Sequence, residues 1–245
     1  MRSSDFAVKL TQGIRWLSFP PMDAFPFILH GFVVKNQDFP ADVKTKDVES
    51  FLQRITSQKR ILISLSQMHQ DECVIITSDD KLKRRYTGDA LLTVRDDIFI
   101  SVWLADCLPI FLVEEKRKAI GLIHAGWRGT LLGIVRRTLE KAKHQLGCEP
   151  SDFTVLFGPC IQSCCYQVSD DVAILFDEEC INRAKDGKAT LDLICANMKQ
   201  LVSCGVKEDK IFVTDKCTFC DEELFYSYRR EKENAGRMIG FMGLK

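Results

Sequence analysis

Residues 98–129, IFISVWLADCLPIFLVEEKRKAIGLIHAGWRG, decide the fold. They contain three runs rich in β-branched and aromatic residues, at Ile98–Leu104, Ile110–Val113 and Ala119–Ile123, and such runs are typical of buried strands. The charged residues 114–118 separate the last two runs, so we expect a hairpin or two adjacent strands there.

A helix should follow Gly129, because apolar residues recur at helical spacing until Gly147. Its core-facing side consists of Leu131, Leu132, Val135, Leu139 and Ala142. Further helices are predicted over Lys46–Gln58, Asp170–Phe176 and Leu191–Val202, and strands over Ile61–Leu65, Val74–Thr77, Thr154–Phe157 and Ile211–Thr214. Strands and helices alternate without a repeat or an obvious linker. We therefore predict one α/β domain over residues 1–245, with a mixed sheet covered by helices.

The composition excludes several classes of protein. The chain carries 34 Lys and Arg against 34 Asp and Glu, so it lacks the basic excess that drives nucleic-acid binding. No apolar run approaches the roughly 20 residues that cross a bilayer, and residues 1–17 are too charged for a secretory signal. We expect a cytoplasmic protein with neither a nucleic-acid nor a membrane partner.

The 11 cysteines are an odd number and cannot all pair within one chain. A reducing cytosol also disfavours disulfides, which leaves packing, metal binding or reactivity as their roles. Cys217 and Cys220 form a Cys-x-x-Cys pair, but Cys160, Cys164 and Cys165 lack the spacing of a second pair. We therefore do not predict a structural zinc site, and Cys164 and Cys165 are interpreted as core residues.

Three residues of types that commonly ligate metals lie near the ends of predicted strands. His124 ends a strand and opens into a glycine-rich turn, whereas Cys107 and His69 each follow a strand. Two histidines and one cysteine can bind zinc and leave a fourth position for water or substrate. The alternative is an ordinary buried histidine and cysteine, because spacing alone does not bring these residues together. His144 lies on the polar side of the predicted helix.

Several motifs occur in an order that resembles the bacterial laccase-domain family of the YfiH type. They are Thr87-Gly88-Asp89-Ala90, Ala105-Asp106-Cys107-Leu108-Pro109-Ile110, His124-Ala125-Gly126-Trp127-Arg128-Gly129, Gly158-Pro159-Cys160-Ile161, Cys164-Cys165-Tyr166-Gln167-Val168, Asp192-Leu193, Cys217-Thr218, Phe225-Tyr226-Ser227-Tyr228-Arg229-Arg230 and Gly236-Arg237. The resemblance extends from about His69 to the end of the chain. The family has been described both as polyphenol oxidases and as purine nucleoside phosphorylases that also deaminate adenosine.

This resemblance implies a fold, a metal and a reaction. The fold is a single α/β/α sandwich, and the metal is zinc, or copper in the oxidase descriptions, held by His69, Cys107 and His124. The implied substrates are purine nucleosides (adenosine, inosine, guanosine and methylthioadenosine) and phosphate. The implied reactions are phosphorolysis of the N-glycosidic bond and deamination of adenosine to inosine.

Other candidate residues follow from the same motifs. Arg128 lies near a helix start, where a guanidinium and the helix dipole can together bind phosphate. Further phosphate ligands are expected at Arg229, Arg230 and Arg237. Asp89 and Asp106 are candidates for acid, base or ribose contacts. Two more candidates are less specific: Cys217 as a catalytic residue in a family motif, and Trp127 as either a purine-stacking or a buried residue.

The sequence departs from the family pattern at two places. Met68-His69-Gln70 replaces a usual Val-His-Gly, and the loop at residues 30–36 is shortened, which affects the substrate rim more than the metal.

A multicopper phenol oxidase needs several His-rich sites, and four histidines cannot build them. The alternatives are a metal-free hydrolase in which Cys107 and His124 form the catalytic pair, and an assembly factor. The sequence does not indicate an oligomeric state.

Overall fold

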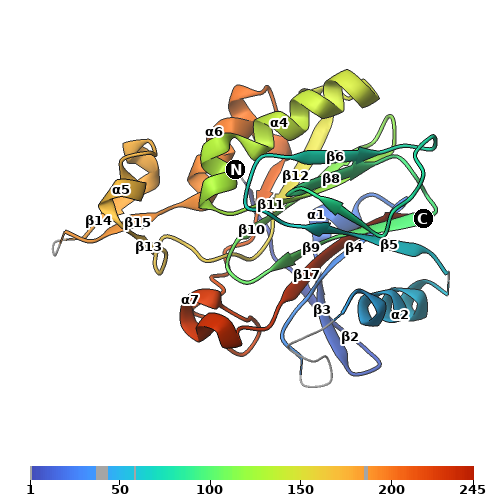
Figure 1. Ribbon diagram of the computed structural model, residues 1–245, viewed down its shortest axis with the longest axis horizontal. Coiled ribbons are helices and arrows are strands. Elements are labelled where there is room, and N and C mark those ends of the chain that lie inside the picture. Colours follow the sequence, from blue (N-terminus) through green and yellow to red (C-terminus); the bar gives the residue numbers. More distant parts are fainter. Residues whose placement is uncertain (1, 37–43, 58, 185–186) are drawn as a thin grey trace.

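Two large mixed sheets form the centre of the molecule (Figure 1). The computed structural model describes residues 2–36, 44–57, 59–184 and 187–245. In these residues, the first sheet has the order β1 (Arg2–Ser3), β16 (Ile211–Val213), β12 (Phe153–Phe157), β10 (Leu108–Glu114), β11 (Ala119–Ala125), β8 (Ala90–Thr93) and β6 (Cys73–Ile76). The second has the order β2 (Ala7–Thr11), β3 (Ile14–Ser18), β4 (Ile28–Val33), β17 (Met238–Leu244), β9 (Ile98–Leu104), β5 (Ile61–Ser66) and β7 (Arg85–Thr87). A small sheet contains β13 (Gln167–Val168), β15 (Ala189–Leu191) and β14 (Ile181–Arg183).

The two large sheets pack face to face, with helices on both outer faces. The helices are α1 (Pro20–Asp23), α2 (Thr45–Thr56), α3 (Trp127–Leu132), α4 (Ile134–Lys141), α5 (Asp170–Ala173), α6 (Leu193–Ser203) and α7 (Tyr228–Glu231). Between the sheets, Phe111 and Leu122 of the first meet Val102 and Met242 of the second in one buried cluster. Helices α4 and α6 cover the first sheet and α2 covers the second (Figure 1). The α/β class with mixed sheets is confirmed, but the strands expected in one sheet are divided between two.

The hairpin expected in the deciding stretch is confirmed. β10 and β11 pair antiparallel from Leu108↔Ala125 to Glu114↔Ala119, and every residue of both strands is buried. Burial on both sides explains why these strands are continuously apolar rather than alternating. β9 belongs to the other sheet, so the chain crosses between sheets over residues 105–107, directly before β10.

The prediction of a single helix after Gly129 is wrong in one respect. Gly133 has a φ of +85° and divides it into α3 and α4, because glycine adopts the left-handed region without steric cost. Leu131 and Leu132 therefore do not face the core and are 39% and 51% exposed. Val135 and Leu139 are buried as predicted, and Gly147 ends the last turn in the left-handed conformation.

Other predicted elements differ mainly at their ends. The helix expected over Lys46–Gln58 is α2, and Gln58 lies outside the described residues. The helix expected over Asp170–Phe176 is only α5, Asp170–Ala173. Cys180 and Cys195 form a disulfide, contrary to the expectation that the cysteines would stay reduced. Among the described residues, no helix combines the length and apolarity needed to span a membrane.

Candidate functional site

Three short connections bring the predicted ligands to one end of the first sheet. Cys107 immediately precedes β10, and His124 lies near the end of β11 opposite Pro109. Asp89 immediately precedes β8, whose Ala90 pairs with Ile123 of β11, and the backbone N–H of His124 donates to the Asp89 carbonyl at 2.7 Å. His69 lies in the turn between β5 and β6.

His69, Cys107 and His124 form a compact donor set. Their ligand atoms all lie within 4.8 Å of one another, and the two imidazole rings meet edge to face with centroids 4.8 Å apart. His124 is buried, Cys107 is half-buried and His69 is exposed. Because two imidazoles and one thiolate leave a tetrahedral zinc ion with one open position, the residues fit a catalytic rather than a closed metal site.

Asp89 orients both histidines. Its carboxylate accepts hydrogen bonds from the backbone N–H groups of Met68, His69 and Gln70, each at 3.0 Å, and from His124 Nδ1 at 2.9 Å. These backbone bonds hold His69 at a φ of +57°. Because a carboxylate only accepts, Nδ1 of His124 carries the proton, and Nε2 is left to bind a metal or Cys107.

The buried charges of this group stabilise one another. Burial opposes ionisation of Asp89, but hydrogen bonds from His124 and Gln70 hold the pKa of its carboxyl below the usual range. Burial also opposes ionisation of Cys107, but His124 and His69 lower the pKa of its thiol from 9.0 to about 6. Although burial disfavours the His124 imidazolium, Cys107 and Asp89 raise the pKa of His124 to about 9. Without metal, the stable form is a thiolate beside an imidazolium.

This ion pair predicts a pH dependence for the metal-free protein. The thiolate is the reactive form, and it forms above the thiol pKa of about 6. We expect alkylation of Cys107 by iodoacetamide to rise with a midpoint near pH 6 and to be fast already at neutral pH. Peptide mass spectrometry of chelator-treated protein measures the rate at each cysteine, and a midpoint near the ordinary thiol pKa would contradict the ion pair.

The glycines of the motif at residues 124–129 allow close packing around the donor set. A Cβ at Gly126 would lie 3.0 Å from Cys107 Sγ and 3.3 Å from the His69 ring. A Cβ at Gly129 would lie 2.8 Å from the Gln70 carbonyl oxygen. The start of α3 therefore approaches both the thiol and the 68–70 turn as closely as only glycine permits.

Gly126→Ala should displace two of the three donors without changing the backbone, because Gly126 has an ordinary φ of −82°. We expect a roughly 10- to 100-fold loss of metal affinity, similar to the loss of an outer hydrogen-bond partner. Competition with a chromogenic chelator measures the affinity. Gly205→Ala is a matched control for glycine replacement, since a Cβ there would meet no atom within 4 Å; that position has a positive φ, so its cost appears in stability rather than in metal binding.

The donor set opens into a pocket of about 1080 Å³. Both sheets, α3 and α7 contribute to its wall. Besides His69, Cys107 and His124, the lining residues are Lys44, Thr45, Ser64, Leu65, Gln67, Arg85, Trp103, Ala105, Asp106, Gly126, Trp127, Arg128, Tyr166, Tyr228, Arg229, Lys232 and Arg237. This volume is slightly above the roughly 300–1,000 Å³ range of small-molecule sites, so the pocket has room for a nucleoside and an anion together.

Two of the predicted arginines lie over aromatic rings of the pocket wall. The Arg128 guanidinium is 4.3 Å from the centre of the Trp127 ring, and that of Arg229 is 5.3 Å from the Tyr166 ring. Such stacking restrains a guanidinium while its N–H groups can still bind an anion. Arg237 also lines the pocket and donates to the carbonyls of Ala235 and Gly236.

Asp106 lines the pocket, but its carboxylate is occupied by the protein. It accepts hydrogen bonds from Thr218 Oγ1 at 2.7 Å, Ser227 Oγ at 2.9 Å and the Arg229 N–H at 2.7 Å. Its φ of +88° occurs where the chain crosses between the sheets. Through these bonds Asp106 holds the start of α7 and the backbone of Arg229 in place.

Three predicted residues do not line the pocket. Asp89 lies behind the donor set. Arg230 donates to the carbonyls of Thr218, Phe219 and Phe225, so its guanidinium is used by the protein. Cys217 is buried among other cysteines. Burial opposes its ionisation, but the backbone N–H groups of Gln162, Cys220 and Phe219 lower the pKa of its thiol.

Sequence reasoning missed several pocket residues. Tyr166 and Tyr228 lie within two of the family motifs, and this position could have marked them as candidate site residues. Lys44, Arg85 and Lys232 lie in polar segments without any motif, and only the tertiary fold brings them to the site.

Comparison with known proteins identifies the family. Residues 28–245 match the family model described as "Multi-copper polyphenol oxidoreductase laccase". The chain is 30% identical to the purine nucleoside phosphorylase YlmD of Bacillus subtilis, over 87% of this chain and 77% of that protein. It superposes on the hypothetical protein YfiH of Bacillus licheniformis with a TM-score of 0.85, at 26% identity and covering 97% of this chain and 99% of the other. The crystal structure of YlmD from Geobacillus stearothermophilus gives a TM-score of 0.84, at 27% identity and covering 98% and 100%. The chain therefore belongs to the multi-copper polyphenol oxidoreductase laccase family, which confirms the resemblance to proteins of the YfiH type.

Proposed function

We propose that this protein is a zinc-dependent purine nucleoside phosphorylase that also deaminates adenosine and accepts methylthioadenosine. The observation that carries the proposal is an open two-histidine, one-cysteine donor set in a pocket with stacked arginines. The YlmD relatives, which are named purine nucleoside phosphorylases, support the same class of reaction. The substrates are then purine nucleosides and phosphate.

His69, Cys107 and His124 would hold the metal, and Asp89 fixes the orientation of both imidazoles. Zinc, when bound, supplies a Lewis acid that activates water or polarises a substrate group. Deamination replaces the exocyclic amine at C6 of adenine with oxygen and releases ammonia, so it requires water at this end of the pocket.

Phosphorolysis requires a different arrangement of groups. A phosphate oxygen forms a bond to C1′ of the ribose while the bond from C1′ to N9 breaks, and the departing purine takes up a proton. Arg128, Arg229 and Arg237 provide positive charge for the phosphate within one pocket. Asp106 accepts the Arg229 backbone N–H and so keeps that arginine in place. Aromatic side chains such as Trp103 and Tyr228 in the lining provide faces on which a purine can stack.

The direct test measures metal content and products in the same preparation. Protein assayed for zinc and copper is incubated with inosine or adenosine, with and without phosphate, and the products are separated by chromatography. Phosphate-dependent release of hypoxanthine and adenine supports phosphorolysis, and phosphate-independent formation of inosine supports deamination. A zinc-loaded protein that produces none of these overturns the proposal.

Arg128→Ala should raise the phosphate requirement while leaving zinc content unchanged. A hydrogen bond to a charged group contributes about 1.5–3 kcal/mol, which corresponds to a roughly 10- to 100-fold higher KM for phosphate. Arg136→Ala, on the exposed side of α4, is the matched control for loss of one arginine. Unchanged phosphate dependence in the Arg128 variant would remove that residue from the phosphate site.

A second candidate function follows from the geometry of Asp89, His124 and Cys107. A nucleophile beside a histidine that is oriented by a carboxylate is also the arrangement of cysteine hydrolases. In that case the Cys107 thiolate attacks the carbonyl carbon of an amide, the amine leaves with a proton from His124, and water hydrolyses the resulting thioester; the chelator-treated protein is then the active form. Activity that survives complete metal removal would favour this hydrolase, whereas activity restored only by added metal would favour the phosphorylase.

Copper-dependent oxidation of phenols has weaker support from the site. Two histidines and a cysteine are also the ligands of single-copper electron-transfer sites. The other two histidines lie elsewhere: His30 is buried and accepts the Phe19 N–H, and His144 is exposed on the helical turn after α4. Oxygen uptake with a phenol by copper-loaded protein tests this activity directly.

A further inference from the structure

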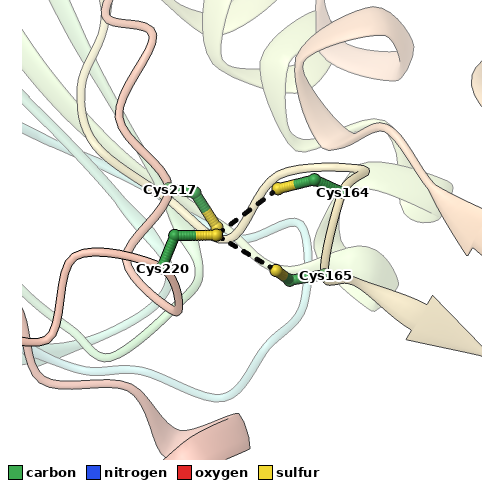
Figure 2. Close-up of side chains that lie close together, drawn as sticks. All are labelled: Cys164, Cys165, Cys217 and Cys220. Atoms are coloured by element: carbon green, nitrogen blue, oxygen red, sulfur yellow. Dashed lines mark hydrogen bonds between the residues drawn. The ribbon is translucent and has the colours of Figure 1, made fainter.

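We propose that Cys164, Cys165, Cys217 and Cys220 form a second metal site, a closed zinc site with four thiolate ligands. All four sulfur atoms lie within 4.8 Å of one another. Two of these residues come from the loop between β12 and β13, and two from the loop between β16 and α7. Figure 2 shows the four side chains converging from the two loops. The site is separate from His69, Cys107 and His124 and does not depend on the proposed reaction.

The sulfur spacing matches the geometry of tetrahedral zinc. Zinc–sulfur bonds of about 2.3 Å place the sulfurs of a regular tetrahedron about 3.8 Å apart. Cys220 Sγ lies 3.8 Å from Cys164 Sγ and 3.3 Å from Cys165 Sγ. Four cysteine thiolates fill every tetrahedral position, which is typical of structural zinc sites. Cys164 and Cys165 are adjacent and lack the Cys-x-x-Cys spacing, so the sequence does not predict this site; the fold brings them to Cys217 and Cys220.

The backbone around Cys217 favours a thiolate ligand. The Gln162 N–H donates to Cys217 Sγ at 3.5 Å, and the N–H groups of Phe219 and Cys220 also hydrogen-bond to this sulfur. The loop is closed by the Asp221 N–H, which donates to the Cys217 carbonyl at 3.1 Å. Hydrogen bonds of this kind fix the orientation of metal ligands and stabilise their negative charge.

The burial of the four cysteines also argues against ordinary core packing. Cys164 and Cys220 are exposed and Cys165 is half-buried, whereas Cys217 alone is buried. Core cysteines are normally fully buried. Four cysteines gathered near the surface from two distant segments are better explained by coordination, in which each thiol loses its proton to solvent as its sulfur binds the ion.

The site would tie together two segments of the pocket wall. Tyr166, directly after Cys165, lines the pocket beneath the Arg229 guanidinium. Thr218, inside the Cys217–Cys220 loop, donates to Asp106 at 2.7 Å. Arg230 donates to the carbonyls of Thr218 and Phe219 in the same loop. A zinc ion bound by both loops would therefore hold Tyr166 and Asp106 in a fixed relation across the wall.

Counting metal ions in the full-length, reduced protein tests the proposal. We expect two zinc ions per wild-type chain and one in the double variant C164S/C220S. H69A should also retain one, because its remaining ion is the thiolate-bound one. Cys204→Ser, a half-buried cysteine outside both clusters, is the matched control and should bind two. Equal zinc content in wild type and C164S/C220S, or iron in place of the second zinc, would overturn the assignment.

A second measurement uses only the wild-type chain, in case the double variant fails to fold. Zinc coordination should slow iodoacetamide alkylation of all four cysteines at least about tenfold relative to zinc-free reduced protein, because the coordinated sulfur is less available. Peptide mass spectrometry measures each cysteine separately. Alkylation of Cys164 and Cys220 at the same rate with and without zinc contradicts the proposal, as does recovery of these residues as disulfides from reduced, zinc-loaded protein.

Discussion

His69→Ala should remove the pocket metal and lower phosphorolysis at least about 100-fold, more than the loss of an outer hydrogen-bond partner of a metal ligand. His69 is one of three donors within 4.8 Å of one another, and its side chain is exposed. The variant should fold, because Asp89 holds the 68–70 turn through backbone N–H groups that alanine keeps. Zinc analysis and the rate of hypoxanthine release from inosine are measured on the same samples.

This substitution also separates the two chemistries that the site permits. His69 is one of the three candidate metal ligands, but it is not a member of the Asp89, His124 and Cys107 triad of the second candidate function. A metal-free thiol enzyme should stay active in H69A, with its pH profile moved to higher pH because His69 helps to lower the thiol pKa of Cys107, and should lose activity in C107S, whereas a zinc enzyme should lose activity in both. His144→Ala, an exposed histidine on a helical turn, is the matched control. Activity retained in H69A would contradict the metal-dependent mechanism.

Local composition places each donor beside a recognisable strand, whereas the resemblance to the family, and not the spacing, joins the three donors into one set. His124 follows a continuous apolar run, and Cys107 precedes another. Local patterns do not show which strands pair with each other. Ile123 pairs with Ala90, more than 30 residues away in sequence, and only this pairing places Asp89 beside His124. The role of Asp89 as an orienting group therefore required the tertiary structure.

The division into two sheets and the thiolate cluster were hidden for a related reason. β9 is as apolar as β10, so its composition does not show that the chain changes sheets at Asp106. Cys164-Cys165 and Cys217-x-x-Cys220 are separated by more than 50 residues, so they do not have the local spacing of a zinc ribbon. Gly133 was visible in the sequence, but isolated glycines inside a helical pattern are often tolerated, and only the backbone shows that this one separates α3 from α4.

Asp89→Asn should be the most damaging single-atom change at the site. Asp89 is fully buried, and its two oxygens accept hydrogen bonds from the 68–70 turn and from His124. Asparagine has one acceptor oxygen and an amide group that only donates. If its oxygen faces Met68 and Gln70, its amide faces the N–H of His69 and Nδ1 of His124. The opposite orientation leaves the N–H groups of Met68 and Gln70 without an acceptor.

Both orientations lower stability, and the first also lowers metal affinity. Each buried donor left without a partner costs about 1–3 kcal/mol, so two such donors lower the free energy of unfolding by about 2–6 kcal/mol. An amide facing Nδ1 also favours the tautomer with the proton on Nε2, which should weaken metal binding roughly 10- to 100-fold. Urea unfolding measures the first effect, and chelator competition the second.

The pH dependence of this difference distinguishes a lost carboxylate from a general packing defect. The pKa of Asp89 is lowered in the folded protein, so its stabilising contribution is fully present above the unfolded pKa of about 3.9 and is lost as the pH falls through the folded-state value. The contribution of the Asp89 carboxylate to the stability difference between wild type and D89N should therefore shrink in acid. Asp71→Asn is the matched control, because Asp71 forms a surface ion pair with Arg137, and such pairs contribute about 0–1 kcal/mol. A D89N protein as stable and as zinc-rich as D71N would show that the Asp89 carboxylate does not organise the site.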